Sequence, residues 1–183
     1  MATLTLRPNS DSSVACTQFG TGTGNYGRVN EATADDTNGV VSPTGTLGSP
    51  VTSVDRYGLP DPSESGTINK ITLYGRLKRV DTTYSATSLL VRVGTKNYTY
   101  AKSATSSYVL YDTALTTNPA TSSAWTWANI NDLVIGVSLI GVYYNFGTEK
   151  VPAYNYHRSY CSQLYVEVDY TPANNLWFMF FHR

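Results

Sequence analysis

Residues 68–80 read INKITLYGRLKRV, and apolar side chains alternate with polar ones along this stretch. Ile71, Leu73 and Leu77 stand at odd positions, whereas polar or charged side chains occupy most of the positions between them. A period of two is typical of a β-strand that buries one face and exposes the other. The stretch therefore predicts a long strand whose odd-numbered residues face a core.

The same alternation recurs along the chain, between segments rich in glycine, proline and aspartate. It predicts strands at 3–7, 40–41, 51–57, 68–80, 89–93, 96–101, 108–115, 133–144 and 160–170, with a weaker candidate at 13–18. Two of these strands, 89–93 and 96–101, are separated only by Gly94 and Thr95 and are expected to form a hairpin. A short helix is expected at 127–133, because Thr126 can cap its start and the apolar residues recur at a spacing of three.

Composition agrees with a fold built from strands. The 183 residues include 25 Thr and 15 Tyr, which favour a pleated, half-buried surface. The length suits one domain with a real core. We therefore predict one all-β domain over residues 1–172, an antiparallel β-sandwich of jelly-roll type, followed by an apolar tail at 173–183.

Charge and hydropathy limit the classes of partner that the chain is expected to bind. Thirteen basic and thirteen acidic residues cancel, whereas nucleic-acid binding usually needs a basic excess. The longest apolar run, 133–144, is too short to span a bilayer. No secretory signal opens the sequence, so synthesis in the cytoplasm is expected.

Cys16 and Cys161 could pair if the first and last strands are neighbours, or remain separate thiols.

Signals of catalysis are poor. The two histidines, His157 and His182, lack the spacing of a zinc site, and no nucleophile elbow accompanies the serines. The glycine-rich residues 20–27 read GTGTGNYG, which predicts a flexible surface loop because no P-loop lysine follows. Asp35 and Asp36 share a loop with Glu31, where calcium would be the ion of choice, although Asx turns explain such loops without a metal. We expect no enzyme and no cofactor.

Tyrosines supply the one binding signal. They crowd residues 143–160, and Tyr74, Tyr98 and Tyr100 are expected to point outward nearby. Exposed tyrosines stack on sugar rings and also dominate protein interfaces, although cross-strand tyrosine pairs are an ordinary structural alternative. The predicted ligand face consists of Tyr143, Tyr144, Tyr154, Tyr156 and Tyr160.

Six large apolar residues stand in a row in the tail, and such a run is an aggregation hazard when exposed. Either the tail folds back on its own core, or it docks on a neighbouring subunit as an added strand or an aromatic anchor. The predicted assembly contacts are Leu176, Trp177, Phe178, Met179, Phe180 and Phe181.

Several segments, in a fixed order, resemble uncharacterised structural proteins of phages and archaeal viruses. They are residues 4–9 (LTLRPN), 29–31 (VNE), 35–37 (DDT), 55–60 (DRYGLP), 66–71 (GTINKI), 117–121 (TNPAT), 125–127 (WTW), 130–131 (IN), Leu133 and 163–168 (QLYVEV). The resemblance implies a non-enzymatic β-sandwich subunit of a virion: a decoration, spike, fibre or tail component. Its expected partners are further copies of itself and other particle proteins, in a virion or extracellular assembly. A carbohydrate-binding or lectin-like host-attachment domain is the alternative function.

Overall fold

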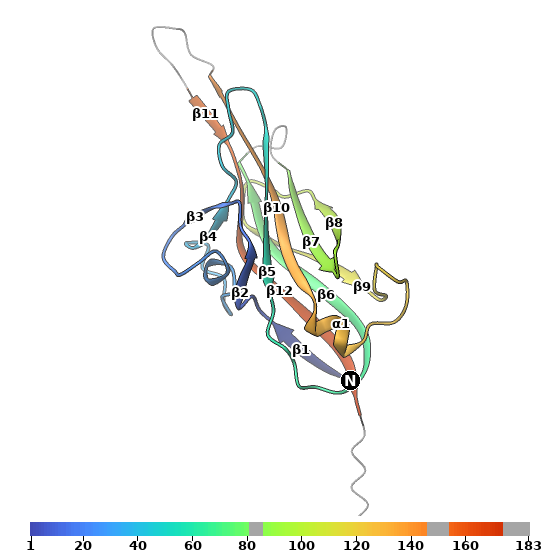
Figure 1. Ribbon diagram of the computed structural model, residues 1–183. Helices are drawn as coiled ribbons and strands as arrows, with labels where there is room; N and C mark the ends of the chain where they lie inside the picture. The colour runs from blue at the N-terminus through green and yellow to red at the C-terminus, as the bar shows by residue number, and fades with distance from the viewer. Residues whose placement is uncertain (81–85, 146–153, 174–183) are drawn as a thin grey trace, which may run out of the picture.

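Two antiparallel six-stranded sheets, here called sheet A and sheet B, form the two layers of the protein (Figure 1). The computed structural model describes residues 1–80, 86–145 and 154–173. Sheet A contains β1 (Ala2–Leu6), β3 (Thr17–Phe19), β4 (Gly39–Val41), β6 (Gly66–Arg79), β9 (Val109–Leu115) and β12 (Ser159–Pro172). Sheet B contains β2 (Ser10–Ser13), β5 (Val51–Gly58), β7 (Thr87–Val93), β8 (Lys96–Lys102), β10 (Val134–Asn145) and β11 (Tyr154–His157).

The order of the strands is that of a jelly roll. When β4, β5, β6, β7, β8, β9, β10 and β12 are counted one to eight, sheet A has the order one-eight-three-six and sheet B the order two-seven-four-five. Successive strands of this kind wrap the chain around a single sandwich. The predicted all-β, antiparallel sandwich is confirmed. The strands β1, β2, β3 and β11 add to its edges.

The core lies between the sheets and follows the predicted alternation. β6 and β12 pair over their whole length, from Arg79 opposite Ser159 to Gly66 opposite Pro172. Their inward side chains Ile71, Leu73, Leu77, Leu164, Val166 and Val168 are fully buried. Midway along β6, a Cβ atom on Gly75 would lie 2.3 Å from Leu89 Cδ2 of sheet B. Glycine is therefore needed here for the two sheets to approach each other.

The predicted helix is confirmed as α1 (Trp127–Asn131), which is shorter than the expected 127–133. Thr126 accepts a hydrogen bond from Asn129 N, and Asn129 in turn accepts one from Thr126 N. This reciprocal cap gives hydrogen-bond partners to the main-chain N–H groups of Thr126 and Asn129 at the start of the helix. The Trp127 ring meets Tyr170 edge to face, and Trp127 Nε1 donates to Gly66 O, so α1 closes the end of the sandwich at which β12 ends.

Two expectations fail in detail. The strand expected at 13–18 is replaced by β2 and β3 on either side of it, in different sheets. Tyr98 and Tyr100 point inward and not outward, because β8 pairs with β7 so that they lie opposite the buried Val91 and Leu89. Of the two alternatives left open for Cys16 and Cys161, the structure has separate thiols, which pack against the same core.

Candidate functional site

The predicted tyrosine face does not form one surface. Tyr143 of β10 lies opposite Tyr156 of β11, and their ring centroids are 5.9 Å apart. Tyr144 projects from the other face, where its ring meets His157 edge to face at 5.7 Å. Tyr160 belongs to sheet A and lies in a separate cluster. The side chain of Tyr154 lies outside the described part of the structure.

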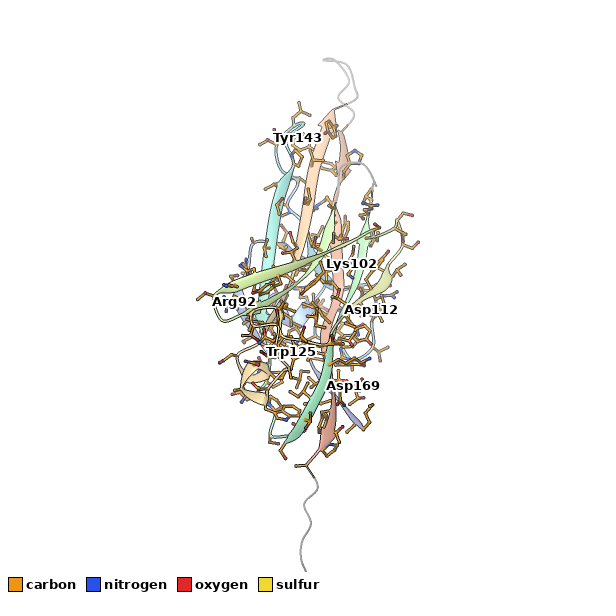
Figure 2. The ribbon with its side chains drawn as sticks, turned by 90° about the vertical axis from the view of Figure 1, so that its right-hand side faces the viewer. Arg92, Lys102, Asp112, Trp125, Tyr143 and Asp169 are labelled. Carbon is orange, nitrogen blue, oxygen red and sulfur yellow. The ribbon has the colours of Figure 1, made fainter. Side chains whose placement is uncertain are left out.

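The tip of the molecule carries a row of three side chains, in which Leu47 joins two tyrosines of the predicted ligand face. Leu47 forms a β-bridge with Tyr143, and Gly48 N donates to Tyr143 O at 3.0 Å. Leu47, Tyr143 and Tyr156 thus lie side by side across three segments at one end of the molecule, near the Tyr143 label of Figure 2. Leu47 is 54% exposed and Tyr156 51% exposed. We call these three residues the tip row.

Tyr160 contributes to a cluster of rings around a lysine on the outer face of sheet A. Lys78 Nζ lies 5.1 Å from the centroid of the Tyr108 ring and 5.3 Å from that of Tyr160. Phe19 meets Tyr160 edge to face at 5.8 Å. Each cation–π contact of this kind stabilises a surface by about 0.5–1 kcal/mol. The lysine already covers the ring faces, so this cluster has less free aromatic surface than the tip row.

A second tyrosine pair stabilises the same face of sheet A. The rings of Tyr74 and Tyr165 stack at 4.7 Å, and the Arg7 guanidinium lies 4.7 Å from the centroid of the Tyr165 ring. Desolvation, and then the nearby Glu167 charge, raise the pKa of Tyr74 to about 12. The phenol therefore stays neutral at physiological pH. This is the cross-strand pairing expected of structural tyrosines.

Arg76, Lys78 and Arg79 form a basic cluster on β6 that is partly neutralised. Arg76 donates to both carboxylate oxygens of Asp36, through Nε at 2.7 Å and Nη2 at 2.6 Å. These hydrogen bonds lower the pKa of Asp36, with help from the Ser162 hydroxyl, and raise that of Arg76. The cluster therefore carries less net positive charge than its sequence indicates.

The other loop carboxylates are held by their own loop. Asp35 accepts from Thr37 N at 2.9 Å and from Thr37 Oγ1 at 2.8 Å, and these bonds lower its pKa. Glu31 Oε1 accepts from Asn38 Nδ2 at 2.8 Å. Across residues 1–80, 86–145 and 154–173, no three His, Cys, Asp or Glu side chains are grouped as ligands of a metal ion. The bond from Thr37 N to Asp35 is that of the expected Asx turn.

Asp55, in the middle of β5, is a fully buried carboxylate with 0% exposure. Its carboxylate accepts from Ala15 N at 2.6 Å, Cys16 N at 2.8 Å, Asn25 Nδ2 at 2.6 Å and the Tyr57 hydroxyl at 2.9 Å. Four donors satisfy a buried carboxylate. Asp55 thereby fastens residues 15–25, including much of the glycine-rich loop, to sheet B.

Further bonds hold the glycine-rich loop in place. Arg28 donates to Gln18 Oε1 at 3.0 Å, to Phe19 O at 3.0 Å and to Gly22 O at 3.1 Å. Asp11 accepts from the backbone N–H groups of Asn25 and Tyr26. Three side chains, those of Asp11, Asp55 and Arg28, therefore hold the segment that was predicted to be a flexible loop.

The two thiols beside Asp55 are poor nucleophiles. Burial is the main cause that raises the pKa of Cys161 to about 12, and burial together with the Asp55 charge raises that of Cys16 strongly. A thiol reacts as its thiolate, which is scarce here at neutral pH. The carboxylate, the phenol and the thiols thus form a structural cluster.

The free edge of sheet A exposes apolar side chains. β9 ends the order of sheet A among the described strands, and its Val109 and Leu110 are 40% and 43% exposed. Lys102 Nζ donates to the main-chain oxygen of Asp112 at 2.5 Å, and Figure 2 views the side of the molecule on which both are labelled. The predicted assembly segment, 176–181, lies outside the described residues, which end at Ala173 beside β6.

No family model matches the chain, and no curated protein matches it. No helix in the described ranges is long and apolar enough to cross a membrane. The function is therefore inferred from the chain's own geometry.

Proposed function

We propose that the chain is a non-enzymatic structural subunit that assembles with further copies of itself, as a component of a viral particle or of a related filament. The observation that carries the proposal is the exposure of Val109 and Leu110 on the free edge of β9. Jelly rolls build many viral capsids, which supports a particle role as a fold-level analogy. Decoration, spike, fibre and tail components all fit this description.

The polar groups are engaged in bonds within the fold, which supports association between copies more than catalysis. Catalysis needs titratable groups that meet a substrate in a concave site. In the described residues, the Asp55 carboxylate is enclosed by its four donors and Asp36 is paired with Arg76. The apolar side chains of Val109 and Leu110 on the β9 edge, and those of Leu47 and Tyr156 in the tip row, are by contrast exposed to a partner.

Light scattering of the purified chain over a range of concentrations tests the proposal. The full chain is expected to show a mass of at least two copies, and a variant that lacks residues 176–183 reports whether the aromatic segment takes part. Self-assembly is refuted if the full chain and the shortened variant are both stable monomers.

The tip row favours carbohydrate binding as a second candidate function, because the exposed Tyr156 ring lies next to the half-buried Tyr143 ring at the end of the molecule. A glycan array, with calcium and with a chelator, tests it. Binding that is lost in Tyr156→Ala but kept in Tyr74→Ala supports a saccharide site at the tip. An array without any bound glycan refutes it.

A further inference from the structure

We infer that the self-assembly contact is β9 against β9: the strand pairs antiparallel with β9 of a second copy about a two-fold axis at Leu110, and two A sheets become one. The inference rests on the proposed function and specifies its interface. A two-fold contact between identical patches is the commonest way in which soluble proteins assemble.

The main chain of β9 is available on one side. β9 pairs with β6 from Val109 opposite Leu77 to Leu115 opposite Ile71, and no described strand lies on its other side. The Lys102 ammonium reaches the carbonyl of Asp112, so that carbonyl is accessible from the free side. In an antiparallel strand, the N–H and C=O of one residue point the same way and alternate residues agree. The main-chain groups of Leu110 therefore point to the free side as well.

The side chains at this edge suit a partner that is apolar on both faces. Leu110 lies opposite Arg76 on the outer face, whereas Val109 lies opposite the buried Leu77 on the inner face. Both are more than a third exposed, so each sheet face has one large apolar side chain without full cover. A second β9 brings the same pair and covers both at once.

Charge narrows the choice of register, and burial of Leu110 against its own copy favours an axis at Leu110. A two-fold axis that keeps outer faces together places each residue opposite one of the same face, so the two residue numbers add to an even total. An axis at Asp112 would set two carboxylates opposite each other, and an axis at Tyr111 would set Asp112 against Leu110; both are unfavourable. An axis at Leu110 sets Leu110 opposite itself, Val109 opposite Tyr111, and Tyr108 opposite Asp112, so that each Asp112 faces an uncharged residue.

Lys102 opposes this pairing. Its ammonium occupies the Asp112 carbonyl, and an edge lysine is a common device against uncontrolled strand addition. It sits on a flexible side chain, so it can leave the carbonyl at a modest cost. Lys102 would then limit how tightly two copies bind without preventing them from pairing.

Disulfide trapping tests the register. Leu110→Cys places two thiols across the axis at a Cα separation of about 5.5 Å, which suits a disulfide. Ala114→Cys, on the same face of the same strand, places them about 27 Å apart in this register. Under mild oxidation, Leu110→Cys should give a covalent dimer, whereas Ala114→Cys and the parent chain should not. Equal trapping of both variants, or none in Leu110→Cys, overturns the inference.

Light scattering separates this inference from the proposed function. Leu110→Lys should raise the dissociation constant by about tenfold or more, and Leu47→Lys, the same change at a similarly exposed leucine, should leave it unchanged. If the parent chain assembles and Leu110→Lys assembles equally well, the interface is wrong while self-assembly stands. If the parent chain is monomeric at every concentration, both proposals fail.

Discussion

Replacing Asp55 should destabilise the protein more than replacing any surface aspartate. Asp55→Ala removes the acceptor of four hydrogen bonds and leaves Ala15 N, Cys16 N and the Tyr57 hydroxyl without this partner. Asn25 Nδ2 keeps one bond, to Cys16 O at 3.2 Å. Each buried donor without a partner costs about 1–3 kcal/mol, and breaking a buried charged network typically costs about 3–5 kcal/mol. The two N–H groups are only partly buried and can recruit water, so we expect about 3–4 kcal/mol.

Graded substitutions separate the charge from the packing. Asp55→Asn keeps the shape but turns one acceptor oxygen into a donor that faces other donors, for which we expect about 2 kcal/mol. Tyr57→Phe removes a single bond to the same carboxylate and should cost about 1 kcal/mol. Asp61→Ala, at an exposed position outside the network, is the matched control and should change stability by less than about 0.5 kcal/mol.

Urea denaturation followed by circular dichroism measures these differences. With a slope of about 2 kcal/mol per molar urea, Asp55→Ala should lower the midpoint by about 1.5–2 M. An Asp55→Ala midpoint no lower than that of Asp61→Ala would show that the carboxylate does not organise the fold. A Tyr57→Phe effect as large as that of Asp55→Ala would show that the single bond from the Tyr57 hydroxyl, and not the four-donor network, carries the stabilisation.

Three further outcomes follow from the described contacts. Thr126→Ala should lower the unfolding free energy by about 1 kcal/mol, because it removes the cap of α1, and the urea midpoint reports it. Asp36→Asn should make the unfolding free energy depend less on pH at the acid end, which we call the acid limb. The pKa of Asp36 is lowered in the folded state, so its stabilising contribution is present above its unfolded pKa of about 3.9 and is lost as the pH falls toward the folded pKa. An unchanged acid limb would contradict the role of the bond to Arg76. Gly136→Ala should cost about 3 kcal/mol or more, because its Cβ would lie 2.3 Å from the main-chain oxygen of Asp55, whereas Gly27→Ala meets only an ordinary contact and should fold normally.

Alternation predicted most strands because the sandwich buries one face of each. The period of two located β6 and β12 and their inward residues, and the Thr126 cap located α1. The same period does not by itself show which face of a strand points toward the core. The side to which Tyr98 and Tyr100 point is set by the pairing of β8 with β7, and an amphipathic ring is compatible with either side.

The site residues depended on contacts that no local pattern contains. The predicted strand at 51–57 contains Asp55 but gives no sign of its donors, because Ala15 and Cys16 come from about forty residues away. Leu47 lies in a segment rich in glycine and proline and is aligned with Tyr143 only by a parallel bridge. The exposure of Leu110 follows from the position of β9 at the end of sheet A, which is a property of the strand order.

The proposed β9 contact constrains which particle component the chain could form. A two-fold axis perpendicular to the sheet reverses the strand direction, so the long axes of two paired copies run in opposite senses. The tip row lies at one end of the molecule, as Tyr143 shows in Figure 2, while Asp169 lies toward the other end. Two paired copies would thus present their tip rows in opposite directions. A spike or host-attachment role requires tips that all point away from a particle, whereas a filament or shell uses contacts at both ends. Pairing through β9 therefore favours a filament or shell subunit, and electron microscopy of assemblies with all tips on one side would exclude this arrangement.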